Sequence, residues 1–204
     1  MTEKYLDKVY GARDATQTRQ LYDDWAASYE TEVGAQGYAT PGRAAAALAK
    51  FVTDPTQPIL DFGCGTGLSG LALRLAGFTT IDGVDLSADM LAQARGKDVY
   101  RALTQIEADA TLLHEPGDYA AISAIGVIGP GAAPITVFDS LMHGLDSGGM
   151  LVFSFNDHAL SDRCNEARLC EWTDCGAARL LFREHGDHLP GLNMKSTVYV
   201  VEKI

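Results

Sequence analysis

Short apolar runs of strand length alternate along the chain with stretches in which apolar residues recur at helical intervals. Five such runs lie between residues 59 and 155, and continuously apolar runs are typical of parallel strands covered on both faces. Two later stretches, 178–185 and 195–202, alternate apolar and polar residues and predict two more strands. The pattern therefore predicts an α/β fold with a parallel-centred sheet and an antiparallel edge.

Helical spacing marks the segments before and between these runs. Apolar residues over 16–30 predict a helix with one apolar face, whereas residues 1–15 carry no periodic signal. Pro41 suits the first turn of a helix, and the alanines that follow it favour helix. Further helices are predicted over 68–76, 87–96, 132–145 and 158–172.

The first apolar run, Ile59–Phe62, ends in a turn that has glycine at alternate positions, Gly63, Gly65 and Gly67. Glycine is needed where the backbone turns tightly or lies flat against a ligand, because a Cβ would collide there. The helix that follows points its unpaired N–H groups and the positive end of its dipole at whatever lies over the turn. Such a corner binds polar or anionic groups of a nucleotide-like cofactor.

The second and third apolar runs each end in an acid. Asp85 comes 18 residues after Gly67, close to the spacing of ~20 residues at which a second-strand acid bonds a ribose. One carboxylate can accept hydrogen bonds from both ribose hydroxyls. Asp109 ends the third run, 103–108, and a helix cap or a solvated loop acid is the alternative interpretation of it. The glycine turn and the two acids, at the ends of three successive strands, are together a more specific signal for a cofactor site than any one of them alone.

These segments, 61–67, 84–91 and 107–110, resemble the class I S-adenosylmethionine-dependent methyltransferases, and the resemblance extends from about residue 20 to residue 204. In that family the glycines border the methionine part of the cofactor, the second-strand acid holds the ribose and the next acid lies near the adenine amine. The segment 22–41 is further similar to the methyltransferase-like group named after the Williams–Beuren syndrome critical region.

The resemblance implies a Rossmann-like, doubly wound, seven-stranded and mostly parallel sheet with an antiparallel C-terminal edge strand and helices on both faces. It implies one domain over 1–204, in which residues 1–40 form a helical lid. The residues expected to bind S-adenosylmethionine are Tyr22, Tyr29, Asp61, Gly63, Gly65, Gly67, Asp85, Leu86, Met90, Asp109, Ala110 and Ile125. Asp61 would anchor the cofactor's ammonium group through charge or a water. Leu86 and Met90 would sandwich the adenine, with ordinary core packing as the open alternative for both.

The expected reaction is in-line transfer of the methyl group to a small-molecule acceptor, without a metal. A sulfonium methyl is already electrophilic, so the protein has to orient the acceptor and exclude water. No catalytic base is assigned. Asn156, Asp157 and His158 follow the fifth apolar run and are expected on the substrate side, whereas His143 lies in a predicted helix away from a strand end.

The sequence also allows two other functions. An NAD(P)-dependent oxidoreductase shares the glycine turn and the second-strand acid, but its Gly-x-Gly-x-x-Gly fingerprint would need glycine where Leu68 stands. A regulatory module that binds S-adenosylmethionine without turnover would explain why no base is evident.

The composition and net charge of the chain limit which binding partners and which cellular location are expected. The 204 residues are 47% hydrophobic and 21% charged, which is ordinary for a globular protein. A net charge of −11 repels phosphate backbones and anionic lipid, so neither nucleic acid nor membrane is expected as a partner. The polar N-terminus lacks a signal-peptide core, and glycines and prolines interrupt the uncharged stretch 119–138. We therefore expect a cytoplasmic protein with reduced cysteines; its oligomeric state is not predicted.

Overall fold

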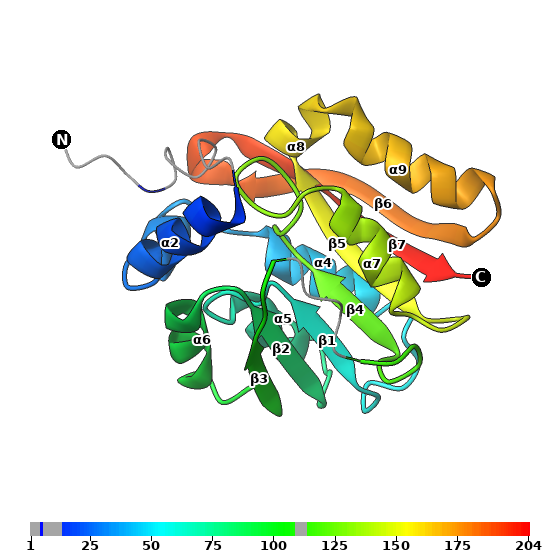
Figure 1. The fold of residues 1–204 in the computed structure, drawn as a ribbon, viewed down its shortest axis with the longest axis horizontal. Coiled ribbons are helices and arrows are strands. Elements are labelled where there is room, and N and C mark those ends of the chain that lie inside the picture. The colour runs from blue at the N-terminus through cyan, green and yellow to red at the C-terminus, as the bar shows by residue number, and fades with distance from the viewer. Residues whose placement is uncertain (1–4, 6–13, 109–113) are drawn as a thin grey trace.

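The computed structural model describes residue 5, residues 14–108 and residues 114–204. In this part of the chain one seven-stranded sheet has the order β3-β2-β1-β4-β5-β7-β6 (Figure 1). Its strands are β1 Ile59–Phe62, β2 Ile81–Asp85, β3 Ala102–Gln105, β4 Ala121–Ala124, β5 Met150–Asn156, β6 Ala178–Leu189 and β7 Met194–Lys203. The strands β1 to β5 pair in parallel, and β7 pairs antiparallel with both β5 and β6. The predicted fold class is confirmed, and the antiparallel β7 lies one place inside the edge strand β6.

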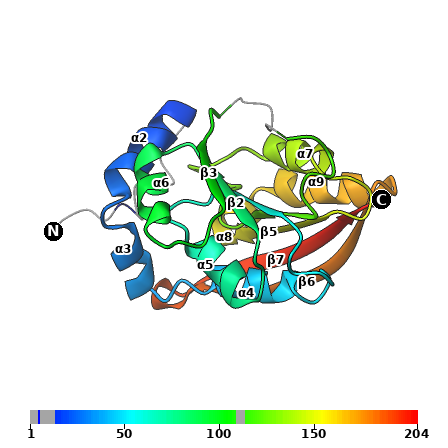
Figure 2. The ribbon, with the colours of Figure 1, turned by 90° about the horizontal axis from the view of Figure 1, so that it is seen from below.

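Helices cover both faces of this sheet (Figure 2). The helices of the described residues are α2 Ala15–Trp25, α3 Tyr29–Ala35, α4 Thr40–Leu48, α5 Leu68–Leu75, α6 Ala88–Arg95, α7 Thr136–His143, α8 Asp157–Ser161 and α9 Arg163–Asp174, with a short 3-10 helix η2 at Pro190–Leu192. The helices α4 and α5 pack on one face, and α7 and α9 pack on the other. α2 lies beside α6 at one end of the sheet (Figure 1).

The two cores follow from the alternation of side chains along each strand. Ile59 packs with Leu48 of α4 and Leu73 of α5, whereas its neighbour Leu60 packs with Leu141 of α7 on the opposite face. All four side chains are buried, and burying one such side chain contributes roughly 1.5–3 kcal/mol to stability. The sheet is therefore a rigid support whose strand ends can present a site.

Several element boundaries differ from the predicted ones. The predicted helix over 16–30 is two helices, because residues 26–28 form a turn between α2 and α3. The predicted helix over 158–172 begins again at Asp162, whose carboxylate accepts a hydrogen bond from Cys164 N and so starts α9. β6 runs on to Leu189, beyond the predicted end at 185.

The uncharged stretch 119–138 contains β4, a loop and the first turn of α7. Within the described residues no helix is both long enough and apolar enough to cross a bilayer.

Candidate active site

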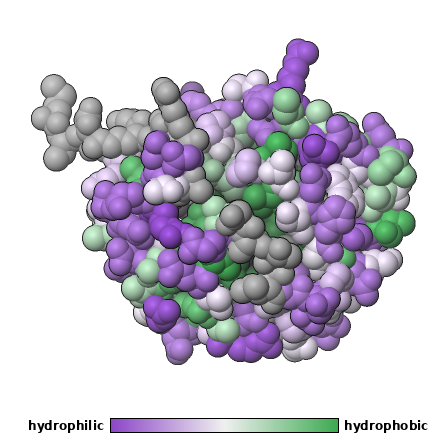
Figure 3. Space-filling view, viewed as in Figure 1, coloured by the Kyte–Doolittle hydropathy of each residue, from purple (hydrophilic) through white to green (hydrophobic). Residues whose placement is uncertain are grey.

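A cavity of about 700 Å³ opens at the carboxyl ends of β1, β2 and β4. Strand order reverses between β1 and β4, and such a reversal leaves a crevice where ligands bind in α/β sheets. Hydrophobic residues show in a hollow near the middle of this face of the molecule (Figure 3). The cavity is bordered by α2, by the glycine turn, by the end of β2 and by the loop between β4 and α7.

The glycine turn forms the floor of the cavity. Gly63, Gly65 and Gly67 all have left-handed φ angles of 68°, 54° and 92°, which side chains with a Cβ rarely adopt. A Cβ on Gly63 would lie 2.6 Å from Val127 Cγ2, whereas a Cβ on Gly65 would meet no atom within 4 Å. Gly65 therefore leaves open space against its backbone, which a ligand can fill. Gly67 caps the start of α5 and does not line the cavity.

Asp85 at the end of β2 joins the turn to the next helix. Its Oδ2 accepts a hydrogen bond from Gly65 N at 2.8 Å, and its Oδ1 accepts one from Ser87 N at 2.9 Å. Burial raises the pKa of Asp85, and the backbone N–H groups that it accepts from oppose that rise. Each carboxylate oxygen has two lone pairs, so both can still accept a hydroxyl hydrogen from a ligand.

Asp61 lies behind the cavity wall, in full burial. Its carboxylate accepts hydrogen bonds from the hydroxyls of Ser69 at 2.6 Å, Tyr100 at 2.7 Å and Ser123 at 3.1 Å. Burial raises the pKa of Asp61 to about 6, and these hydroxyls oppose the rise. Ser69 lines the cavity, so any action of Asp61 on a ligand would pass through this hydroxyl.

The helices α2 and α3 close one side of the cavity, where Tyr22 and Tyr29 line it. Beneath them Trp25 is buried, with its ring 5.9 Å from that of Tyr22 and 4.8 Å from that of Tyr29.

Polar contacts bind this helical segment to the rest of the protein. Arg19 forms an ion pair with Glu107, and Glu30 forms one with Lys97. Ser87 donates a hydrogen bond to Asp23. The segment therefore rests on the loops that follow β2, α6 and β3.

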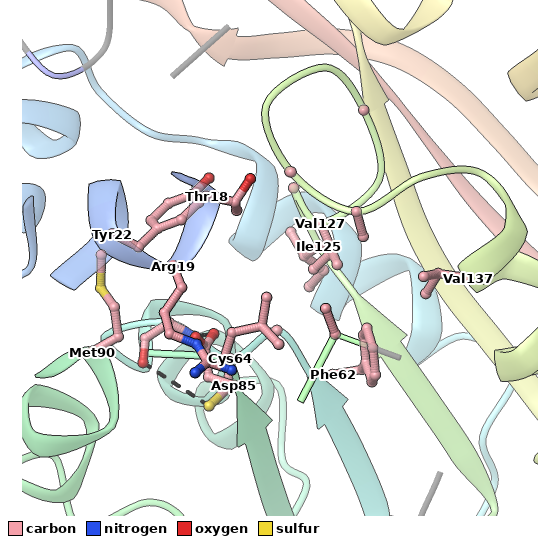
Figure 4. A pocket seen from close by; sticks show the side chains of 18 of the residues that line it. Thr18, Arg19, Tyr22, Phe62, Cys64, Asp85, Met90, Ile125, Val127 and Val137 are labelled. Carbon is pink, nitrogen blue, oxygen red and sulfur yellow. Dashed lines mark hydrogen bonds between the residues drawn. The ribbon is translucent and has the colours of Figure 1, made fainter. Parts of the chain in front are cut away.

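Four apolar side chains gather on the side of the cavity away from Asp85. Phe62, Ile125, Val127 and Val137 gather on one side, and Asp85 lies on the other (Figure 4). Cavity-lining residues that were not predicted as site residues include Thr18, Arg19, Phe62, Thr66, Val127 and Val137. The signal that could have found several of them is their place in loops after strand ends, where ligands bind in such folds.

The residues predicted from the sequence fall into three groups. Those that line the cavity are Tyr22, Tyr29, Gly63, Gly65, Asp85, Leu86, Met90 and Ile125. Those that do not line it are Asp61 and Gly67. Asp109 and Ala110 lie outside the described residues. Two of the residues considered as a possible catalytic base can also be placed. Asn156 lines a small second pocket. The ring of His143 lies 5.1 Å from that of Trp172.

Comparison with known proteins bears on this geometry. Residues 59–149 match the model of a methyltransferase domain family. Methyltransferase-like protein 27 of Homo sapiens is 30% identical over 162 residues, which are 78% of this chain and 66% of that protein. Residues 59–149 contain the glycine turn, Asp85 and the cavity's apolar side. This chain belongs to the class I S-adenosylmethionine-dependent methyltransferases.

Solved structures agree with this methyltransferase fold. The [4+2]-cyclase SpnF has a TM-score of 0.70 at 17% identity, over 94% of this chain and 97% of that one. The methyltransferase in the complex with the Haloferax volcanii Trm112 methyltransferase activator has a TM-score of 0.70 at 16% identity, over 91% of this chain and 97% of that one. At such identities the likeness shows the fold alone. The subgroup suggested by the N-terminal segment stays a prediction.

Family membership makes S-adenosylmethionine the cofactor of this methyltransferase, and the cavity has features that suit it. Thr66 Oγ1 is buried at the cavity wall without a hydrogen-bond partner among the described residues, and an unpaired buried hydroxyl is costly until a ligand satisfies it. The open backbone at Gly65 and the acceptors of Asp85 offer room and hydrogen bonds for a ribose. The donor and acceptor set therefore fits a nucleoside.

Proposed function

We propose that this methyltransferase transfers the methyl group of S-adenosylmethionine to a small molecule that binds in the same cavity. The observation that supports the proposal most is the division of one cavity into a side with hydrogen-bonding groups at the glycine turn and Asp85 and an apolar side at Phe62, Val127 and Val137. The first side suits the cofactor. The second suits an uncharged organic acceptor, because apolar walls give a charged group no partner.

In this proposal the protein acts by orientation and by exclusion of water. Asp85 would hold the ribose hydroxyls, Leu86 and Met90 would pack against the adenine, and Tyr22 and Tyr29 would cover the cofactor from the lid segment. The bound cofactor supplies an electrophilic methyl group. Orientation of an acceptor in line with the bond that breaks can lower a barrier by roughly 7–11 kcal/mol at best. We further propose one domain with residues 1–40 as its lid, and no nucleic-acid partner.

Isothermal titration calorimetry with S-adenosylhomocysteine tests the cofactor half of the proposal. Asp85→Asn should weaken binding roughly 10- to 100-fold, because a hydrogen bond to a charged group contributes about 1.5–3 kcal/mol. Asp89→Asn is the matched control, since Asp89 is an exposed acid on the following helix. An affinity of the Asp85 variant equal to that of the control would contradict the assignment.

A methylation screen tests the acceptor half. Small uncharged molecules, an RNA pool and a protein lysate are incubated with the enzyme and with S-adenosylmethionine labelled in its methyl group. Label in the small molecules alone is the expected result, and label in RNA or protein would overturn the proposal while the cofactor assignment stood.

A further inference from the structure

A second pocket of about 70 Å³ lies behind the tyrosines of the main cavity. The two share as walls Tyr22, Tyr29, Tyr38, Gly126, Gly129 and Ala132. Its other lining residues are Trp25, Val33, Ile128, Pro130, Ser154, Asn156, His188 and Leu189. No Asp, Glu, Lys or Arg is among the described residues that line it. A charged ligand would have no counter-charge in this inner pocket, so its walls suit an uncharged one.

His188 is held in the inner pocket by a chain of hydrogen bonds. Its Nδ1 lies 2.8 Å from Thr40 Oγ1, and Thr40 Oγ1 lies 2.8 Å from Ser196 Oγ. Arg43 Nη1 donates a hydrogen bond to Ser196 Oγ at 3.2 Å. Thr40 and Arg43 lie on α4 and Ser196 lies on β7, whereas His188 lies on β6. The hydrogen bonds therefore join three elements.

Only one direction of this chain of hydrogen bonds gives the buried Ser196 hydroxyl hydrogen an acceptor among the described residues. Arg43 has donors and no acceptor, so the buried Ser196 hydroxyl has Thr40 Oγ1 as its acceptor among these side chains. The Thr40 hydroxyl, which accepts from Ser196, then donates to His188 Nδ1. A neutral imidazole that accepts at Nδ1 carries its proton on Nε2. His188 therefore offers an N–H donor on its remaining nitrogen.

The surroundings keep this imidazole uncharged. Burial is the main cause that lowers the pKa of His188 to about 4; Asp157 opposes this shift, and the charges of Arg43 and His158 add to it. The ring of Tyr38 lies 5.3 Å away in an edge-to-face arrangement. At neutral pH the ring is thus a neutral donor.

A second donor of the inner pocket lacks a partner. The Trp25 side chain is 2% exposed, and its indole Nε1 has no hydrogen-bond partner among the described residues. A buried N–H without a partner costs about 1–3 kcal/mol, and a ligand that accepts a hydrogen bond would remove this cost.

The backbone also directs His188 at this place. The register of β6 against β7 shifts between Asp187 and Leu189, so His188 is the extra residue of a β-bulge. Such bulges re-aim a side chain and occur next to active sites.

We propose that the inner pocket is the anchoring subsite for the methyl acceptor, and that it takes an uncharged molecule whose carbonyl-type oxygen accepts hydrogen bonds from His188 Nε2–H and Trp25 Nε1–H. The inference rests on the proposed function. His188 and Trp25 bind this oxygen and undergo no bond change. The atom to be methylated is a different atom of the acceptor, which faces the main cavity. Its lone pair forms the new bond to the methyl carbon, the electron pair of the broken bond stays on sulfur, and any proton that the methylated atom carried is released to solvent.

Heteronuclear NMR of the protein saturated with S-adenosylhomocysteine tests the tautomer. The ¹⁵N shifts of His188 should show the proton on Nε2, and Thr40→Val should weaken this preference, with the exposed Thr53→Val as control. A proton on Nδ1 in the unaltered protein would overturn the inference, whether or not the variants fold.

Three ring compounds of similar size test the ligand class. Cyclohexanone has a carbonyl oxygen, methylenecyclohexane has none and cyclohexylammonium is charged. Cyclohexanone alone should shift the His188 and Trp25 N–H signals, and His188→Phe should abolish its effect on Trp25. His185→Phe is the matched control, because His185 lies on the same strand with a side chain 50% exposed.

The outcomes separate this inference from the proposed function. S-adenosylhomocysteine that fails to bind the unaltered protein contradicts the proposed function itself. Cofactor binding together with a response to cyclohexylammonium, or with equal responses to all three compounds or none, overturns the inference alone.

Discussion

Replacement of Asp61 by asparagine removes a carboxyl group that, when it ionises, places a negative charge in the protein interior. Three hydroxyls surround the carboxylate, from Ser69, Tyr100 and Ser123. Burial outweighs these hydrogen bonds and raises the pKa of Asp61 from 3.8 to about 6. A difference of about two pKa units between the folded and unfolded states corresponds to roughly 3 kcal/mol of stability.

The sign follows from proton binding. The folded state binds the Asp61 proton more tightly than the unfolded state, so this group lowers the free energy of unfolding as pH rises between 3.8 and about 6. Below that window both states are protonated and the group has no effect. Above it the destabilisation is complete. Asp61→Asn lacks this titration, so its stability relative to the unaltered protein should rise by about 3 kcal/mol across the window.

Urea unfolding at a series of pH values from about 3.5 to 7 and at constant ionic strength measures the difference. The asparagine side chain also changes the free energy of unfolding by an amount that does not depend on pH. The quantity that tests the reasoning is therefore how the difference in free energy of unfolding between the variant and the unaltered protein changes with pH. Asp89→Asn, at an exposed acid, should leave the pH dependence unchanged. A difference between the Asp61 variant and the unaltered protein that does not vary with pH would refute the argument from burial.

Three further changes test the cavity. Gly63→Ala should weaken S-adenosylhomocysteine binding in calorimetry, because its Cβ would lie 2.6 Å from the nearest side-chain atom at a φ of 68°. Gly42→Ala, where a Cβ meets nothing within 4 Å, is the control, and equal affinities would contradict the close approach. Tyr29→Ala should weaken cofactor binding with an unchanged circular dichroism spectrum; unchanged affinity would count against a lid. A double-mutant cycle on Arg19 and Glu107 should give about 0.2–1 kcal/mol of coupling in unfolding that falls with salt, because both side chains are partly exposed; zero coupling would show that the pair does not hold α2.

The glycine turn and Asp85 could be located from the sequence because both depend on local order. Parallel strands that follow one another end at the same edge of a sheet, so a motif at each strand end is enough to bring them together. The hydrogen bond from Gly65 N to Asp85 is the consequence. The shape of the glycine turn is equally local, since it follows from residues that tolerate positive φ.

The surroundings of Asp61 could not be predicted in this way. Tyr100 is 39 residues away in sequence and Ser123 is 62 residues away. A hydroxyl in a strand or a loop carries no periodic signal that assigns it a partner. Its burial with a carboxylate depends on how separate elements pack, which periodicity does not contain.

The turn that divides the N-terminal helices was missed for a related reason. Trp25, Ala26 and Tyr29 continue the helical spacing of apolar residues, although residues 26–28 form a turn. Trp25 and Ala26 are buried with Val33 of α3 in one cluster. The apolar face therefore runs through the break, and spacing alone cannot reveal it.

The strand order explains why His188, near the C-terminal end of the chain, lines a pocket beside the main cavity. β7 is antiparallel to both of its neighbours, so β6 runs in the same direction as β1, β4 and β5. The carboxyl end of β6, where His188 lies, consequently falls at the same edge of the sheet as the glycine turn. The alternating pattern alone predicts two antiparallel strands at the edge of the sheet and does not indicate that either strand ends at the ligand site. Because the hairpin is inserted with β7 inward, its outer strand ends at the ligand edge and its bulge can supply a donor there.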